Sequence, residues 1–201
     1  MQRSADLATG SPGRSDGAPP RRATRAVRVG TEWIGGGHPV LIQSMTVADS
    51  MDTAAAAAEV RELVAAGCPL VRLTTPSIRE AENLRTIRER LAAEGVRVPM
   101  VADVHFTPNA ALAAARIVEK VRVNPGNYAD RKRFAVREYS DEEYAAELAR
   151  VADRFRPLVA ELRAHGCALR IGANHGSLSD RILNRYGDTP EGMVESALEF
   201  V

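Results

Sequence analysis

Short apolar runs alternate with longer helical patterns through most of this sequence, and this alternation limits the possible folds more than any other feature. The runs are nearly continuous, which is typical of strands in a parallel sheet that is buried on both faces. Strand–helix units that recur at roughly thirty residues predict a parallel α/β fold. The expected strands are Val40–Met45, Leu70–Thr75, Met100–Val104, Lys120–Val123 and Leu169–Gly172.

The segments between these strands carry the signals of helix ends. Asp52 is placed to cap one helix, and Ser140 with Glu143 forms the pattern of a capping box. Pro157 predicts a kink or a split in the long helix that follows. The expected helices are Thr53–Ala66, Arg79–Glu94, Asn109–Val118, a segment from Ser140 to just before Gly166, and Pro190–Val201. A hairpin of Val27–Val29 and Glu32–Ile34 precedes all of them.

Five such units fit either a TIM barrel or a doubly wound sheet. The expected fold class is α/β, as a TIM-type (β/α) barrel with about five of its eight units, in residues 26–201. Residues 1–25 are rich in Gly, Pro, Ser and Arg and are expected to form a disordered tail. The sequence stops inside a predicted helix, so we expect a fragment of a longer protein.

Composition excludes several classes of function. The chain has 201 residues, of which 45% are hydrophobic and 26% charged, with a net charge of +1. This balance favours neither nucleic acid nor membrane as a partner, and a cytoplasmic location is expected. Cys68 and Cys167 lie far apart without metal-ligand spacing, so both are expected to pack in the core and no metal site is predicted in this chain.

Three predicted strands each carry an arginine among apolar residues: Arg72 in LVRLTT, Arg122 in KVRVNPGN and Arg170 in ALRIGANHG. A buried guanidinium needs a carboxylate, an anion or water. All three lie near the carboxyl ends of their strands, where α/β folds bind ligands. Because guanidinium groups bind phosphate in a bidentate manner, the pattern predicts a phosphate or diphosphate site. The alternative is a stabilising network in which these arginines pair with Asp103 or other acids.

Polar residues accompany the arginines at the same strand ends. Asp103 and His105 share one side of the strand in VADVHF, and a carboxylate beside a histidine is a common arrangement for proton transfer. We treat both as candidate catalytic residues, although a hydrogen-bonded strand end would also explain His105. Asn124 and Asn174 can donate to substrate oxygens or can satisfy the backbone of a turn.

The segments IGGGHPVLIQSMT, LVRLTTPS, PMVADVHF, KVRVNPGN and LRIGANHGSLSDRIL together resemble the N-terminal barrel of the 4-hydroxy-3-methylbut-2-enyl diphosphate synthase family, in its larger, plant-like form. The resemblance runs from about Val27 to Val201. It implies reductive ring opening and dehydroxylation of 2-C-methyl-D-erythritol 2,4-cyclodiphosphate in isoprenoid biosynthesis. It also implies that Arg72, Arg122 and Arg170 hold the diphosphate, with Asp103, His105, Asn124 and Asn174 lining the same pocket.

The resemblance further implies a 4Fe–4S cluster, reduced by ferredoxin or flavodoxin, in a homodimer. The cluster ligands belong to a C-terminal domain that is absent from this chain, and Cys68 and Cys167 do not match them. The chain alone is therefore expected to be inactive. Two alternatives remain: a phosphate-binding barrel similar to the pterin-binding synthases, and a non-catalytic fragment that only binds phosphorylated ligands.

Overall fold

The structure is a computed structural model that describes residues 22–130 and 138–201. Five parallel strands form one sheet in the order β3-β4-β5-β6-β7, which is also their order along the chain. A doubly wound sheet reverses its strand order at a switch point, and this sheet does not, so the barrel expectation is confirmed. The strands are β3 (Gln43–Met45), β4 (Leu70–Thr74), β5 (Met100–Val104), β6 (Lys120–Val123) and β7 (Ala168–Ile171).

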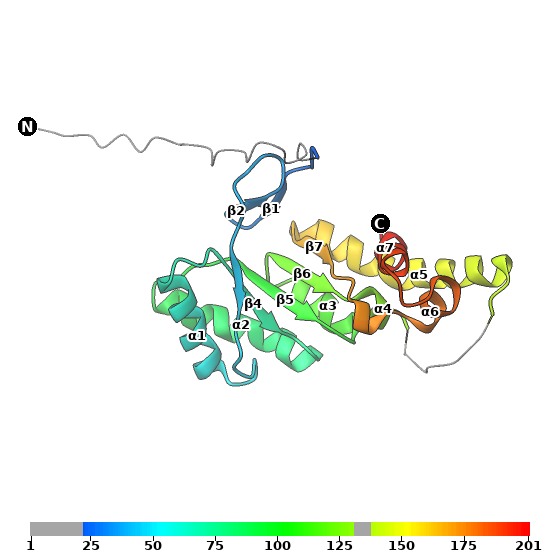
Figure 1. Ribbon diagram of the computed structural model, residues 1–201. Helices are drawn as coiled ribbons and strands as arrows, with labels where there is room; N and C mark the ends of the chain where they lie inside the picture. The colour runs from blue at the N-terminus through cyan, green and yellow to red at the C-terminus, as the bar shows by residue number, and fades with distance from the viewer. Residues whose placement is uncertain (1–21, 131–137) are drawn as a thin grey trace, which may run out of the picture.

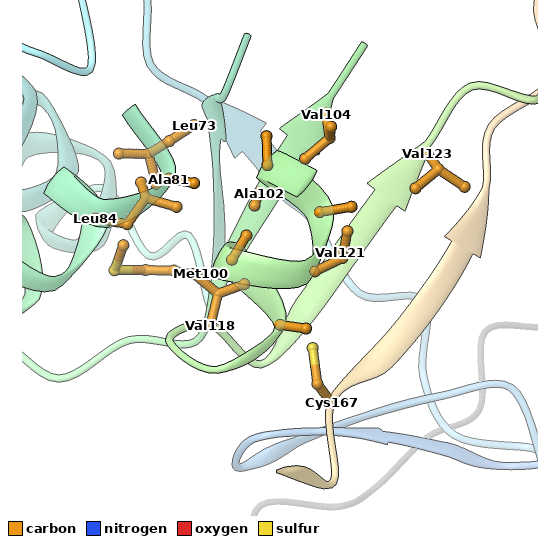
Figure 2. Packing of buried hydrophobic residues seen from close by; sticks show 14 of the residues in the cluster. Leu73, Ala81, Leu84, Met100, Ala102, Val104, Val118, Val121, Val123 and Cys167 are labelled. Atoms are coloured by element: carbon orange, nitrogen blue, oxygen red, sulfur yellow. The ribbon is translucent and has the colours of Figure 1, made fainter. Parts of the chain in front are cut away.

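The structure describes seven α-helices, of which α1, α2, α3 and α5 pack on one face of the sheet, as Figure 1 shows for α1, α2 and α3. Their bounds are α1 (Thr53–Ala65), α2 (Ile78–Ala93), α3 (Pro108–Ala115), α4 (Pro125–Tyr128), α5 (Asp141–His165), α6 (Asp180–Tyr186) and α7 (Pro190–Leu198), with a 3₁₀ turn η1 (His175–Ser177). Alternate strand residues face these helices and form the main core. Figure 2 shows part of this core, with Leu84 of α2, Ala102 of β5 and Val121 of β6 among the packed side chains.

The strands β1 (Val27–Val29) and β2 (Glu32–Ile34) form the expected antiparallel hairpin with the expected bounds. Val29 of the hairpin packs against Leu70, Val101 and Ala168 in a second apolar cluster. These three residues stand early in their strands and alternate with the helix-facing ones, so the hairpin covers the amino ends of the strands on the face without helices. The carboxyl ends of that face, which we call the inner face, are left for polar groups.

Several boundary predictions were wrong, and the helices expected over Asn109–Val118 and Pro190–Val201 end earlier, at Ala115 and Leu198. The expected strand Val40–Met45 shrinks to Gln43–Met45, because β3 pairs only with β4 and only over those three residues. Pro157 does not split the long helix, and α5 runs unbroken from Asp141 to His165. Pro157 lies on the exposed side of α5, where water can reach the carbonyl that its missing N–H leaves free.

Other differences concern the loops. The stretch after β7, expected to be a loop, contains η1 and α6; the Ser179 side chain accepts a hydrogen bond from the Ile182 N–H and caps α6. The expected caps are confirmed at Asp52, whose side chain accepts from two backbone N–H groups, and at Ser140, which forms a full capping box with Glu143. Most of the expected tail, and residues 131–137, lie outside the described residues.

A buried ion-pair network ties the C-terminal helices together. Arg181 of α6 is only 4% exposed and pairs with Asp130, at 2.7 Å, and with Glu199. Tyr144 of α5 donates to Glu199 at 2.5 Å. Two carboxylates thus balance the buried guanidinium, and their combined effect raises its pKa although burial alone would lower it. No helix of the described ranges combines the length and apolarity needed to cross a bilayer.

A candidate anion-binding site on the inner face

Charged side chains of the inner face come from four neighbouring strands, β4 to β7. The register places Asp103 of β5 beside Arg122 of β6, and Arg122 beside Arg170 of β7. Arg72 of β4 and Lys120 of β6 share this face by the period of two. Four cations therefore share this face with one carboxylate, and the arginines that sequence reasoning selected do lie on one surface. Arg122 and Arg170 stand one residue before the carboxyl ends of their strands, whereas Arg72 is the middle residue of β4.

Asp103 is the centre of this group. The residue is almost fully buried, at 3% exposure, and its Oδ1 accepts a hydrogen bond from Arg122 Nη1 at 2.9 Å. Its Oδ2 lies 3.4 Å from Arg72 Nε. The alternative of a network with Asp103 is thus confirmed for two of the three arginines. One carboxylate offsets one positive charge, so the pair of arginines still presents a net positive charge to a ligand.

Arg122 is held from two sides. Besides Asp103, it donates from Nη2 to the carbonyl oxygen of Gly172 at 2.8 Å, and the residue is 8% exposed. A guanidinium has five N–H groups, and these two bonds use two of them. The remaining N–H groups of Arg122 make no hydrogen bond to any other residue that the structure describes. Arg122 is therefore fixed in place and keeps donors for an anion.

Arg170 and Lys120 are the two cations of the inner face without a carboxylate partner among the described residues. Arg170 is exposed and makes no hydrogen bond or ion pair within residues 22–130 and 138–201. Lys120 is 6% exposed, and its Nζ donates to Gln43 Oε1 at 3.0 Å. Burial, followed by the charges of Arg170 and Arg72, lowers the pKa of Lys120 to about 8. Sequence reasoning missed Lys120, although its place two residues before Arg122 puts both on one face of the strand.

His105 lies at the rim of the site, directly after β5. Its Nε2 is 3.8 Å from Asp103 Oδ2, beyond hydrogen-bond distance, and its side chain is 32% exposed. The structure therefore brings the two candidate catalytic residues together without joining them. Asp103 is occupied by arginines, whereas the His105 ring is open to solvent and to a ligand.

The two asparagines differ in how they are used. Asn124 is buried, caps α4, and exchanges hydrogen bonds with the Ser177 hydroxyl at 2.7 and 3.1 Å, so its amide is engaged between two loops. Gly126 completes this contact, because a Cβ there would lie 1.6 Å from the Ser177 carbonyl oxygen. Asn174 is exposed and accepts from the Gly176 N–H, which leaves its NH₂ group unbonded among the described residues.

The cysteines do not fit an iron–sulfur cluster. Cys68 and Cys167 are both buried in the main core, and their thiols donate to backbone carbonyls. Burial raises the pKa of Cys167 to about 12, which disfavours the thiolate that binds iron. Within the part of the chain that the structure describes, no group of three or more His, Cys, Asp or Glu residues could hold a metal ion.

Five consecutive parallel strands joined through helices, with polar and charged groups on the face without helices, define a domain of the TIM-barrel class. The model of the GcpE TIM-barrel domain matches residues 24–201, and the chain belongs to this family. The match removes the alternative of a pterin-binding-synthase-like barrel.

Curated relatives give the same assignment. The chain is 58% identical over 180 residues to the 4-hydroxy-3-methylbut-2-en-1-yl diphosphate synthase (flavodoxin) of Akkermansia muciniphila, covering 90% of this chain and 31% of that protein. It is 56% identical over 181 residues to the protein of the same name from Leptospira interrogans, covering 90% of this chain and 27% of that protein. The chain thus spans 31% or less of the length of these relatives.

Proposed function

We propose that this chain forms the diphosphate-binding barrel of a 4-hydroxy-3-methylbut-2-enyl diphosphate synthase. The reaction is the reductive ring opening and dehydroxylation of 2-C-methyl-D-erythritol 2,4-cyclodiphosphate in isoprenoid biosynthesis. The family match and the names of the relatives support the proposal. The observation that carries it is the inner face itself, where Arg72 and Arg122 contact the carboxylate of Asp103 and two further cations, Arg170 and Lys120, share the face.

In this proposal the arginines neutralise and orient the diphosphate. Arg122 offers its unused N–H groups from a fixed position, and Arg170 can move toward the ligand because it has no described partner. Opening the ring leaves negative charge on the phosphate oxygen that departs from carbon. Cations already fixed near that oxygen stabilise the developing charge without a cost of reorganisation.

The polar residues take different roles. Asp103 orients Arg72 and Arg122, and its burial between them leaves it poorly placed to carry protons. We therefore assign the candidate proton transfer to His105, which stands at the open rim. Asn174 is a further donor for phosphate oxygens, while Asn124 holds the loop that contains Ser177.

The remaining parts of the proposal concern the whole enzyme. Residues 26–201 form the substrate-binding barrel domain. A 4Fe–4S cluster would supply the electrons, received from ferredoxin or flavodoxin, and its ligands are not found among the described residues. The assembly would be a homodimer, and its expected location is the cytoplasm.

Arg170→Ala is the sharpest test, because Arg170 has no described partner whose loss would disturb the fold. Titration calorimetry with the cyclic diphosphate should show affinity reduced about 10- to 100-fold, the effect of losing a charge-assisted hydrogen bond. Arg61→Ala, which removes an exposed arginine of α1 paired with Glu94, is the matched control and should bind normally.

Two results would contradict the proposal. Failure of the purified wild-type chain to bind the cyclic diphosphate would remove its basis. Equal affinity for inorganic diphosphate and for the cyclic diphosphate would favour the alternative of a binding module that recognises phosphate alone.

A further inference from the structure

Gly172 follows β7 and is fixed by both of its backbone groups. Its N–H donates to the Val123 carbonyl at 2.8 Å, which continues the pairing of β6 with β7. Its carbonyl accepts from Arg122 Nη2 at 2.8 Å. The residue is buried, so neither bond is exchanged easily for a bond to water.

The structure leaves no room for a side chain at Gly172. A Cβ on this residue would lie 2.0 Å from Arg122 Nε and 2.8 Å from Arg122 Cζ. Nonbonded heavy atoms attract one another only at about 3.5–4.0 Å, so both approaches are strongly repulsive. Gly172 is not among the glycines with positive φ, so its backbone conformation suits any residue. The three atoms nearest to that Cβ all belong to the Arg122 side chain, so it is this side chain that requires glycine here.

A side chain at this position would displace Arg122 rather than the strand. The backbone at residue 172 is held in the sheet by the bond to Val123, whereas the guanidinium stands at the end of a flexible side chain. A displaced guanidinium loses its bond to the Gly172 carbonyl or its bond to Asp103, because the two partners fix it from different sides.

We propose that Gly172 is a positioning residue of the anion site: its missing side chain determines where the Arg122 guanidinium stands. The consequence for ligand binding rests on the proposed function, in which Arg122 binds the diphosphate. The position of Arg122 itself does not depend on that function and can be measured without a ligand.

Gly172→Ala tests the proposal, and Gly176→Ala is its control. Gly176 lies in the same loop, also lacks a positive φ, and the nearest atom to a Cβ there is 3.9 Å away. Nitrogen–proton NMR follows the Nε–H signal of Arg122, which is assigned by its loss in Arg122→Lys. The signal should shift or vanish in Gly172→Ala and stay in place in Gly176→Ala. Affinity for the cyclic diphosphate should fall about 10- to 100-fold in Gly172→Ala only.

An Arg122→Met background separates positioning from damage to the fold. If Gly172 acts through Arg122, adding Gly172→Ala to Arg122→Met causes no further loss of affinity and little further loss of thermal stability, because the guanidinium that a side chain would displace is already gone. The proposal is overturned if the Arg122 signal is unchanged in Gly172→Ala, or if Gly172→Ala lowers the melting temperature as much in the Arg122→Met background as in the wild type. A wild-type protein that binds no cyclic diphosphate would refute the proposed function, and the NMR comparison would still decide the role of Gly172.

Discussion

Replacing Asp103 by asparagine tests the central contact of the inner face. Asp103 is buried between Arg122, at 2.9 Å, and Arg72, at 3.4 Å. Asparagine keeps the shape and one acceptor oxygen but removes the negative charge. Arg122, only 8% exposed, would then be a buried cation without a counter-charge. We expect the variant to be less stable than the wild type.

The magnitude follows from burial. Breaking a buried ion pair by removing one partner costs about 3–5 kcal/mol, and the acceptor that asparagine retains places this case near the lower end, at about 3 kcal/mol. For a domain of this size, that loss corresponds to a decrease of about 6–12 °C in melting temperature.

Glu94→Gln is the matched control. Glu94 also lies between two arginines, at 2.7 Å from Arg61 and 3.4 Å from Arg90, but all three side chains are substantially exposed. An exposed pair contributes less than about 1 kcal/mol, so this variant should melt close to the wild type. Chemical unfolding by urea, followed by circular dichroism, measures both variants under the same conditions.

The affinity of Asp103→Asn for inorganic diphosphate is a second measurement on the same variant. Removing the only carboxylate of the group leaves it more positive, so inorganic diphosphate should bind Asp103→Asn more tightly than the wild type and recover part of the lost stability. Equal stability of Asp103→Asn and wild type would refute the argument that Asp103 balances the buried arginines. So would a diphosphate affinity that falls in the variant.

Three further predictions follow from the same structure. Lys120 loses its charge as the pH rises through about 8, so the affinity of the wild type for diphosphate should fall between about pH 7 and pH 9. The wild type should bind diphosphate more tightly than Lys120→Met at pH 7 and equally at pH 9, and a difference that does not change with pH would show that the charge of Lys120 does not contribute. Gly126→Ala should lower the melting temperature, because its Cβ would lie 1.6 Å from the Ser177 carbonyl oxygen; an unchanged melting curve would contradict that packing. Arg181→Met should cost about 3–5 kcal/mol in urea unfolding, because Glu199 would lose its buried counter-charge, and a loss below about 1 kcal/mol would place the network at the surface.

Local sequence patterns predicted the elements whose formation depends on nearby residues. The hairpin of Val27–Val29 with Glu32–Ile34 and the caps at Asp52 and Ser140 form as expected, because turn and cap geometry depends on a few neighbouring residues. The α6 helix was missed because its seven residues are too few for a periodic signal, although Ser179 before it and Gly187 after it are usable end signals.

The site was predicted only in part. The residues that share the inner face followed from the period of two along each strand. Arg122 and Arg170 do lie near the carboxyl ends of their strands, whereas Arg72 is the middle residue of β4. The period of two did not predict which residues these arginines contact. The sequence left open whether the arginines face Asp103 or a ligand; the structure pairs two of them with Asp103 and leaves Arg170 without a described partner.

The sequence by itself determined the strands, most of the helices, the family resemblance and the sign of the charge on the inner face. Only the tertiary structure decided the alignment of neighbouring strands, and with it which cation meets the carboxylate and which stays available. Register depends on contacts between residues far apart in the chain, such as Arg122 with Gly172. Local sequence patterns do not predict which distant residues come into contact. For the same reason, the need for glycine at position 172 became visible only when the guanidinium of another strand was found beside it.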